Sequence, residues 1–292
     1  MHYVQAKGIL SAGNGMNLYR GCTHGCIYCD SRSRCYHMDH AFEDIKVKEN
    51  ALTLLEDALR RKRSACMLGT GAMTDPYIPL ESELGYVRGA LSLALRYGFG
   101  FTLQTKSDRV LRDIDLLQAI NERTKCVVQM TLTTYDEALC RKLEPNVCTS
   151  AERFARFAAL QKLREAGIPA VVWLSPILPF INDTEENILG ILRYCAEAKV
   201  KGVICFGMGV TLREGNREYF FAQLDRLFPG MKEQYIRTFG LSYENTSPRN
   251  AELMRLYRAF CEEHGMMHDN AEIFTYLRTF TDKSDETQLS LF

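Results

Sequence analysis

The chain has 292 residues, 46% of them hydrophobic, and its 36 basic and 36 acidic side chains give a formal net charge of zero. This composition favours one large core or two small ones, and it excludes a disordered or collagen-like chain. Zero net charge also excludes the global positive field that holds a protein non-specifically on nucleic acid, though not a local basic site.

The 11 cysteines are an odd number in a chain too long to need a disulfide framework. We therefore expect reduced thiols in a cytoplasmic protein, some of them metal ligands. Residues 1–8 lack the apolar region of a signal peptide, and no apolar run approaches the ~20 residues of a membrane span. No membrane association is expected.

Short apolar or β-branched runs alternate with longer stretches whose apolar residues recur at helical spacing. The predicted strands are residues 16–19, 65–69, 99–105, 125–133, 170–174 and 203–208. The predicted helices cover residues 50–63, 83–98, 110–120, 151–166, 185–192 and 217–227, and a further helix follows Ser247-Pro248 as far as Gly265. Gly98 and Gly167 are expected to end helices, and Asp183-Thr184 to begin one.

Six units of strand and helix predict parallel strands joined by right-handed crossovers. This pattern fits a doubly wound sheet or a barrel. A complete eight-unit barrel needs ~250 residues and about 230 are used here, so we expect a partial (β/α)6 barrel of the TIM type. We expect this α/β barrel at residues 1–235, a C-terminal helical extension at 236–280 and a flexible tail at 281–292. Either architecture places function at the C-terminal ends of the strands.

Three cysteines, Cys22, Cys26 and Cys29, follow the first predicted strand in a loop that contains glycines. Three thiolates can hold three irons of a [4Fe-4S] cluster and leave the fourth iron open for the amino and carboxylate groups of S-adenosylmethionine (SAM). One electron can then break a carbon–sulfur bond of SAM and release a 5′-deoxyadenosyl radical. The alternatives are ordinary thiols, or structural zinc with a fourth ligand from this list: Cys35, His24, His37 and His40.

The spacing Cys22-x3-Cys26-x2-Cys29, with Tyr28 before the last cysteine, resembles the signature of the radical SAM superfamily. Residues beside the motif resemble the spore photoproduct lyase-like branch: Asn17, Tyr19, Gly21, His24 and Gly25. Further matches lie at the ends of successive strands: Gly69-Thr70-Gly71, Thr74-Asp75-Pro76-Tyr77, Thr105-Lys106-Ser107, Arg112-Asp113, Glu144-Pro145 and Pro176-Ile177. The resemblance covers residues 15–265. It implies a [4Fe-4S] cluster, SAM and a reducing partner such as flavodoxin or ferredoxin.

The resemblance also implies roles for individual residues in the cluster motif. Cys22, Cys26 and Cys29 should bind the cluster, and Tyr28 should lie near the adenine of SAM. These four positions all belong to the most specific part of the match.

Five further positions match SAM-binding positions of the family less specifically. Gly69 and Thr70 correspond to the place where such enzymes hold the methionine amino group, and Lys106 could pair with the methionine carboxylate. Thr131 and Thr133 could bond the ribose or the carboxylate. Each has a simpler alternative: a turn glycine, a solvated lysine, or ordinary β-branched strand residues.

One departure from the spore photoproduct lyase pattern concerns the hydrogen donor. That enzyme has a hydrogen-donating cysteine at the end of strand two, where this chain has Gly69-Thr70-Gly71 and its nearest thiol, Cys66, lies at the beginning of the strand. The departure weighs against the same repair chemistry. Cys140 could supply a thiol from another side, but a buried helical cysteine more often behaves as a small hydrophobe.

The last five residues, Gln288-Leu289-Ser290-Leu291-Phe292, follow a polar stretch. They resemble the pentapeptide by which bacterial replication and repair proteins dock on the DNA polymerase sliding clamp. Leu291 and Phe292 would be the apolar anchors in a groove, and Gln288 would hydrogen-bond at its rim. The alternative is a segment that folds back on its own domain.

Together these features predict a radical SAM enzyme that the sliding clamp delivers to DNA, where it repairs or modifies a nucleic-acid lesion. The enzymatic alternative is radical modification of a peptide or small molecule, with the tail irrelevant. The non-enzymatic alternative is a zinc-stabilised interaction module.

Overall fold

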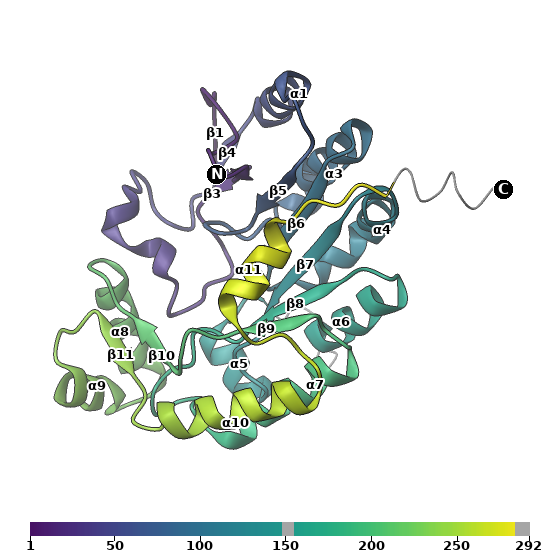
Figure 1. Ribbon diagram of the computed structural model, residues 1–292. Helices are drawn as coiled ribbons and strands as arrows, with labels where there is room; N and C mark the ends of the chain where they lie inside the picture. Colours follow the sequence, from purple (N-terminus) through teal and green to yellow (C-terminus); the bar gives the residue numbers. More distant parts are fainter. Residues whose placement is uncertain (148–154, 284–292) are drawn as a thin grey trace.

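The computed structural model describes residues 1–147 and 155–283 of the chain. Its central feature is a sheet in which neighbouring strands are parallel and follow one another in chain order. The strands are β2 (Gly15–Met16), β5 (Met67–Thr70), β6 (Gly100–Thr105), β7 (Cys126–Thr131), β8 (Ala170–Trp173) and β9 (Gly202–Ile204). Within the described residues the two edge strands, β2 and β9, do not pair with each other, so the curved sheet stays open (Figure 1). The predicted partial (β/α)6 barrel is confirmed.

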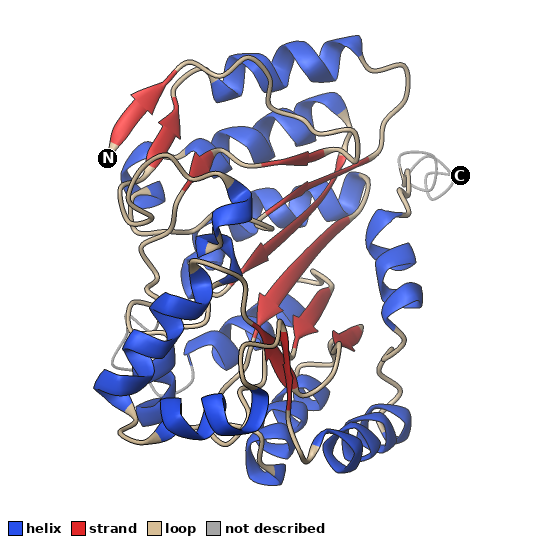
Figure 2. Ribbon diagram, turned by 90° about the vertical axis from the view of Figure 1, so that its left-hand side faces the viewer, coloured by secondary structure: helices blue, strands red, loops and turns tan. Residues whose placement is uncertain are grey.

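Helices cover the outer face of this sheet (Figures 1 and 2). They include α1 (Ala51–Arg61), α3 (Tyr86–Tyr97), α4 (Ile114–Arg123), α6 (Ala155–Glu165) and α7 (Glu185–Glu197). Their boundaries follow the expected capping chemistry. Gly98 ends α3 in the left-handed conformation, with φ 71°, and the Thr184 side chain accepts a hydrogen bond from the Asn187 amide at the start of α7. The predicted helix 83–98 is divided, because Gly85, with φ 67°, separates α2 (Glu81–Leu84) from α3.

The inner face of the sheet is covered at one end by the C-terminal part of the chain. Ile273 and Leu277 of α11 (Asn270–Arg278) pack on Val127, Val171 and Ile204, which point inward from β7, β8 and β9. The preceding helix, α10 (Asn250–Glu263), packs beside α7 and shares the main core. Val127 and Val171 lie near the beginnings of β7 and β8, but Ile204 ends β9. Trp173, which ends β8, lies 5.8 Å from Phe274 between ring centroids, so α11 also reaches the ends of these two strands.

Several short elements surround the barrel. A three-stranded sheet joins β1 (His2–Val4), β4 (Lys46–Lys48) and β3 (Tyr19–Arg20), while β10 (Gly209–Thr211) pairs with β11 (Glu244–Thr246). The additional helices are α5 (Glu137–Leu143), α8 (Asn216–Leu227) and α9 (Met231–Phe239). The predicted strands 16–19 and 203–208 are each interrupted, the second after Ile204, with Gly207 at φ 122°. Among the described residues, no helix is long and apolar enough to cross a membrane.

Candidate active site

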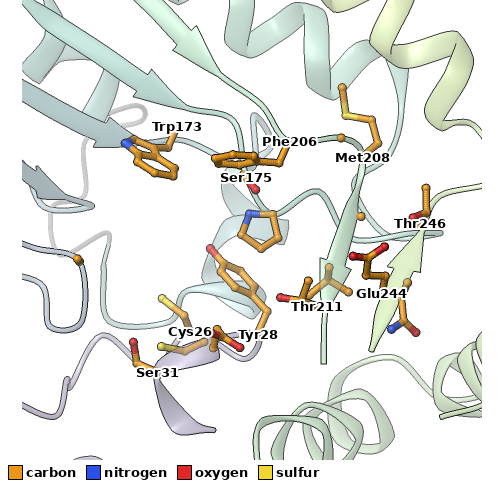
Figure 3. Close-up of a pocket in the computed structure, with 18 of the residues that line it drawn as sticks. Cys26, Tyr28, Ser31, Trp173, Ser175, Phe206, Met208, Thr211, Glu244 and Thr246 are labelled. Carbon is orange, nitrogen blue, oxygen red and sulfur yellow. The ribbon is translucent and has the colours of Figure 1, made fainter. Parts of the chain in front are cut away.

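A cavity of about 590 Å³ lies at the C-terminal ends of the parallel strands, where the sequence predicted function. Cys26 lies at one end and the rings of Trp173 and Phe206 at the other, with Tyr28 between them (Figure 3). Lys106, the residue that follows β6, lines the same cavity. Segments remote in sequence therefore meet around one space.

The cysteine loop begins directly after β3 and depends on a glycine. Gly21 has φ 93°, and a Cβ there would lie 2.5 Å from the carbonyl oxygen of Phe42. That same oxygen accepts a hydrogen bond of 3.0 Å from the Cys22 amide, so the loop passes too close for any side chain at Gly21. Cys26 and Cys29 line the cavity, while Cys22 is buried beside them.

The three thiols influence one another electrostatically. Burial raises the pKa of Cys26 and Cys29, and negative charge on the neighbouring thiols raises it further. The Lys106 ammonium lowers the pKa of Cys26 and so favours its thiolate. Three adjacent thiolates therefore need a cationic group between them, as an iron–sulfur cluster provides.

The arrangement of possible metal ligands bears on the zinc alternative. Within residues 1–147 and 155–283, no three side chains of His, Cys, Asp or Glu converge on one point as ligands of one metal ion would. Zinc requires such convergence, whereas each cysteine of an iron–sulfur cluster binds a different iron. The zinc alternative therefore has no supporting ligand set in this part of the chain.

His24, within the cysteine loop, is 1% exposed and lies against the carboxylate of Asp75, with 3.4 Å between Nδ1 and Oδ2. Burial alone would lower the pKa of His24, but Asp75 outweighs it and raises the pKa to about 10. Neither ring nitrogen has an aligned hydrogen-bond partner in the described structure. A buried imidazolium placed between Asp75 and Cys22 is a donor suited to a cluster sulfur.

Asp75 also fixes the segment after β6. Its carboxylate accepts hydrogen bonds from the Thr105 hydroxyl and the Lys106 amide, each of 2.7 Å, and from the Tyr77 amide at 2.9 Å. Burial would raise the pKa of Asp75, but His24 and these donors hold it below its usual range. One carboxylate thus connects the cysteine loop to the backbone of Lys106.

Glu144, at the end of α5, is a fully buried carboxylate with two cationic partners. Its oxygens lie 3.3 Å from Lys106 Nζ and 2.7 Å from Arg156 Nη1, and it accepts hydrogen bonds from the hydroxyls of Tyr28 and Thr133. Burial would raise the pKa of Glu144, but Arg156 and Lys106 outweigh it and hold the pKa well below the usual range. Glu144 therefore joins Lys106 and Arg156 to the cysteine loop through Tyr28.

Comparison with known proteins identifies the family. The family model "Radical SAM superfamily" matches residues 16–195, more than half of the chain. This chain belongs to the radical SAM superfamily. Members of this superfamily use a [4Fe-4S] cluster and SAM, and membership alone does not specify a reaction.

The similar proteins agree with this assignment. An uncharacterized protein of Mycobacterium tuberculosis is 30% identical over 228 residues, which are 75% of this chain and 65% of that protein. An uncharacterized protein of Methanocaldococcus jannaschii is 30% identical over 172 residues, or 58% and 62% of the two chains. The match thus spans less than two thirds of the length of these relatives.

Solved structures of spore photoproduct lyase show the same fold. A mutant with dinucleoside spore photoproduct has a TM-score of 0.63 at 14% identity, and the alignment covers 90% of this chain and 78% of that one. Another mutant, with bound AdoMet and the same lesion, has a TM-score of 0.56 at 14% identity, covering 86% and 73%. At this identity the likeness establishes the radical SAM fold and not the substrate.

Some residues predicted for this radical SAM site line the cavity and others do not. Those that line it are Cys26, Tyr28, Cys29 and Lys106. Those that do not line it are Cys22, Gly69, Thr70, Thr131 and Thr133. The tail positions Gln288, Leu289, Leu291 and Phe292 lie outside the described residues.

Apart from Cys22, the residues that do not line the cavity lie in or next to strands β5 and β7. Gly69 belongs to β5 instead of a turn, and the turn conformation occurs at Gly71, with φ 103°. A Cβ at Gly69 would meet only Thr102, at 3.8 Å. Thr131 accepts a hydrogen bond of 3.4 Å from Gln104, which does line the cavity. Thr133 lies beyond the end of β7, beside Tyr28 and Glu144.

Sequence reasoning missed several residues of the site. Glu144 and Asp75 match the family pattern, but the resemblance implies no role for either residue. Acidic residues at strand ends and in loops are nevertheless frequent components of functional sites. Arg156 and Phe206 gave no sequence signal. Cys140 is buried beside Glu144 and Arg156, 2.8 Å from Arg156 Nη2, and is not among the residues that line the cavity.

Replacing the buried carboxylate tests the role of charge balance. Glu144→Gln should lower the free energy of unfolding by about 3 kcal/mol, because Lys106 and Arg156 lose their buried counter-charge. The difference from wild type should be complete above about pH 4.3, the pKa of glutamate in an unfolded chain, and shrink as the pH falls through the lower pKa of folded Glu144. Denaturant titration at several pH values measures it.

The matched control is Glu137→Gln in the same helix, which removes a half-buried ion pair with Arg141 one turn away. This variant should cost less than about 1 kcal/mol. If both variants lost the same free energy of unfolding, the proposed contribution of Glu144 to stability would be wrong.

Proposed function

We propose that this radical SAM enzyme repairs or modifies nucleic acid, that Cys22, Cys26 and Cys29 hold its cluster, and that the sliding clamp recruits it. The observation that carries the substrate class is an exposed aromatic surface in the cavity, opposite Cys26. The remaining observations concern the cofactor and the tail, and each has its own test.

The loop of Cys22, Cys26 and Cys29 supports the cluster assignment through its three coupled thiols and the cationic side chain beside them. When bound, the cluster passes one electron from a reducing partner, such as flavodoxin or ferredoxin, to SAM, which splits into methionine and a 5′-deoxyadenosyl radical that abstracts hydrogen. Lys106 lines the cavity, and its ammonium acts electrostatically on Cys26. This position of a cation beside the cysteine loop supports our proposal that Lys106 binds the methionine carboxylate.

The proposed substrate class rests on Phe206 and Trp173. Phe206 is 63% exposed, although large aromatic side chains usually bury most of their surface. Its ring lies 6.0 Å from that of Trp173 and 6.2 Å from that of Phe274, between centroids. The Trp173 indole donates a hydrogen bond of 2.8 Å to Gln129, which holds the ring in place.

A fixed aromatic pair with an open face suits a flat, polar-edged ligand such as a nucleobase. Glu244 lies in the same cavity and offers a carboxylate to the edge of a base. The fold shared with a lyase solved with a dinucleoside lesion is compatible with this substrate class.

The sliding clamp is proposed from the sequence of the last five residues alone. A neutral protein gains little affinity for DNA from its overall charge, so recruitment by a DNA-bound partner supplies what the charge does not.

Reconstitution tests the cluster ligands. Anaerobic reconstitution of the wild-type protein should give about four irons per chain and reductive release of 5′-deoxyadenosine. Cys26→Ala should lose most of the iron, its visible absorption and the cleavage of SAM. Cys35→Ala, which removes an exposed thiol of the next loop, is the control and should retain all three. Full iron content and SAM cleavage in Cys26→Ala would contradict the assignment.

Phe206→Ala should weaken binding of a single-stranded oligodeoxynucleotide about tenfold, because one base loses its stacking partner. Phe206→Tyr should keep near wild-type affinity. Leu241→Ala, which removes another exposed apolar side chain, is the control. Fluorescence anisotropy measures the affinities, and equal binding by Phe206→Ala and wild type would contradict the nucleobase assignment.

Removal of residues 288–292 should reduce binding to purified sliding clamp at least tenfold, because the anchors Leu291 and Phe292 are lost. Ser290→Ala is the control, since the proposed contacts do not use its hydroxyl. Surface plasmon resonance with immobilised clamp measures both. Unchanged binding after the deletion would remove the docking proposal and leave the enzymatic one intact.

A further inference from the structure

A second recess, of about 310 Å³, lies beside the main cavity. Tyr36 and Met73 line both spaces, so they form a shared wall between them. The other walls of the recess come from the start of the chain: Asn17, Tyr19, Arg20, Met38, Lys48 and Thr74. None of the functions proposed above uses this recess.

Two cations line the recess without a carboxylate partner. Arg20, on β3, donates hydrogen bonds to the backbone carbonyls of Tyr36 and His37, and neither it nor Lys48, on β4, forms an ion pair with any described residue. Burial lowers the pKa of Lys48, and the charge of Arg20 lowers it further, so the two cations repel one another.

Other basic side chains nearby do have partners. Lys46, two residues before Lys48 on the same strand, lies 2.7 Å from Asp39, and Arg34 pairs with Glu214. Lys46 and Arg34 thus differ from Arg20 and Lys48, which line the recess. An uncompensated, partly buried pair of like charges is costly unless an anion joins it.

Two buried polar atoms of the recess also lack hydrogen-bond partners. They are Oγ1 of Thr74, a residue that is only 5% exposed, and Oδ1 of Asn17. Buried polar atoms are almost always satisfied, so their absence of partners points to a ligand with several polar atoms. The Thr74 hydroxyl can donate to an oxyanion, whereas the Asn17 oxygen can only accept a hydrogen bond.

We propose that the recess binds a backbone phosphate of the nucleic-acid substrate, next to the nucleotide held in the main cavity. A guanidinium, an ammonium and a hydroxyl together match the charge and the several oxygens of a phosphodiester. Because Tyr36 and Met73 line both spaces, the two spaces adjoin, and neighbouring nucleotides of one chain can occupy them. This inference rests on the proposed function, because it takes the substrate to be a nucleic acid.

The test compares Lys48→Gln, Lys48→Arg and the control Lys46→Gln as reconstituted proteins. The probe is a labelled single-stranded oligodeoxynucleotide, titrated by anisotropy at several salt concentrations. Lys48→Gln should weaken binding about tenfold and reduce the slope of log K against log salt by about 0.7, the value for one phosphate contact with a single strand. Lys48→Arg and Lys46→Gln should keep the wild-type slope.

Thr74→Val, which has nearly the same shape without the hydroxyl, provides a second variant that leaves both charges in place. It should weaken binding without changing the salt slope, because the lost hydrogen bond carries no charge. Circular dichroism of each variant separates loss of the contact from loss of the fold.

The outcomes distinguish this inference from the function on which it rests. If wild type binds the oligonucleotide and Lys48→Gln has the same affinity and slope, the recess assignment is wrong and the nucleic-acid function stands. Binding of inorganic phosphate, followed by 31P NMR, is measured in parallel. If wild type binds no oligonucleotide yet binds phosphate through Lys48, the recess serves a small phosphorylated molecule, and the nucleic-acid assignment fails for both spaces.

Discussion

The site depends on the neutralisation of one buried carboxylate. Glu144 has no exposed surface, and an isolated charge in such a position costs several kcal/mol. Its partners come from four different segments: Tyr28 from the cysteine loop, Lys106 after β6, Thr133 after β7 and Arg156 from α6. Because each segment must approach for the charge to be balanced, the carboxylate fixes the cysteine loop against the ends of the strands.

Asp75 constrains the same region from the opposite side. It contacts His24 in the cysteine loop and accepts hydrogen bonds from Thr105 and the Lys106 amide. Lys106 is thereby held at two points, its backbone by Asp75 and its side chain by Glu144. A loop without regular structure can carry precise chemistry only when polar contacts of this kind replace the missing backbone ladder.

The sequence predicts the strands and helices of the barrel from local patterns, but it does not predict the long-range polar contacts of the site. Apolar periodicity located the strands and outer helices, and Gly98 and Thr184 marked helix ends through local chemistry. Glu144 and Tyr28, which share a hydrogen bond, are separated by 116 residues, and no local pattern encodes such a pairing. Strands of two or three residues, such as β2 and β3, are too short to show a period of two. The inner position of α11 follows from tertiary packing, since its apolar residues suit any buried surface.

The same reasoning applies to the charge balance of the whole chain. In a neutral chain, Lys48 is distinguished by its partial burial beside Arg20, both of which lower its pKa, and not by the lack of an ion pair alone. The phosphate recess and the aromatic pair that we propose would give only weak binding, within the range of about 10⁻⁴ to 10⁻⁶ M for non-specific contacts. The proposed tether to a DNA-bound partner would raise the effective concentration to the millimolar range, above these dissociation constants. Under this proposal a neutral protein with a small local phosphate site needs only docking to supply proximity, and the weakness of each contact would let it release undamaged DNA readily.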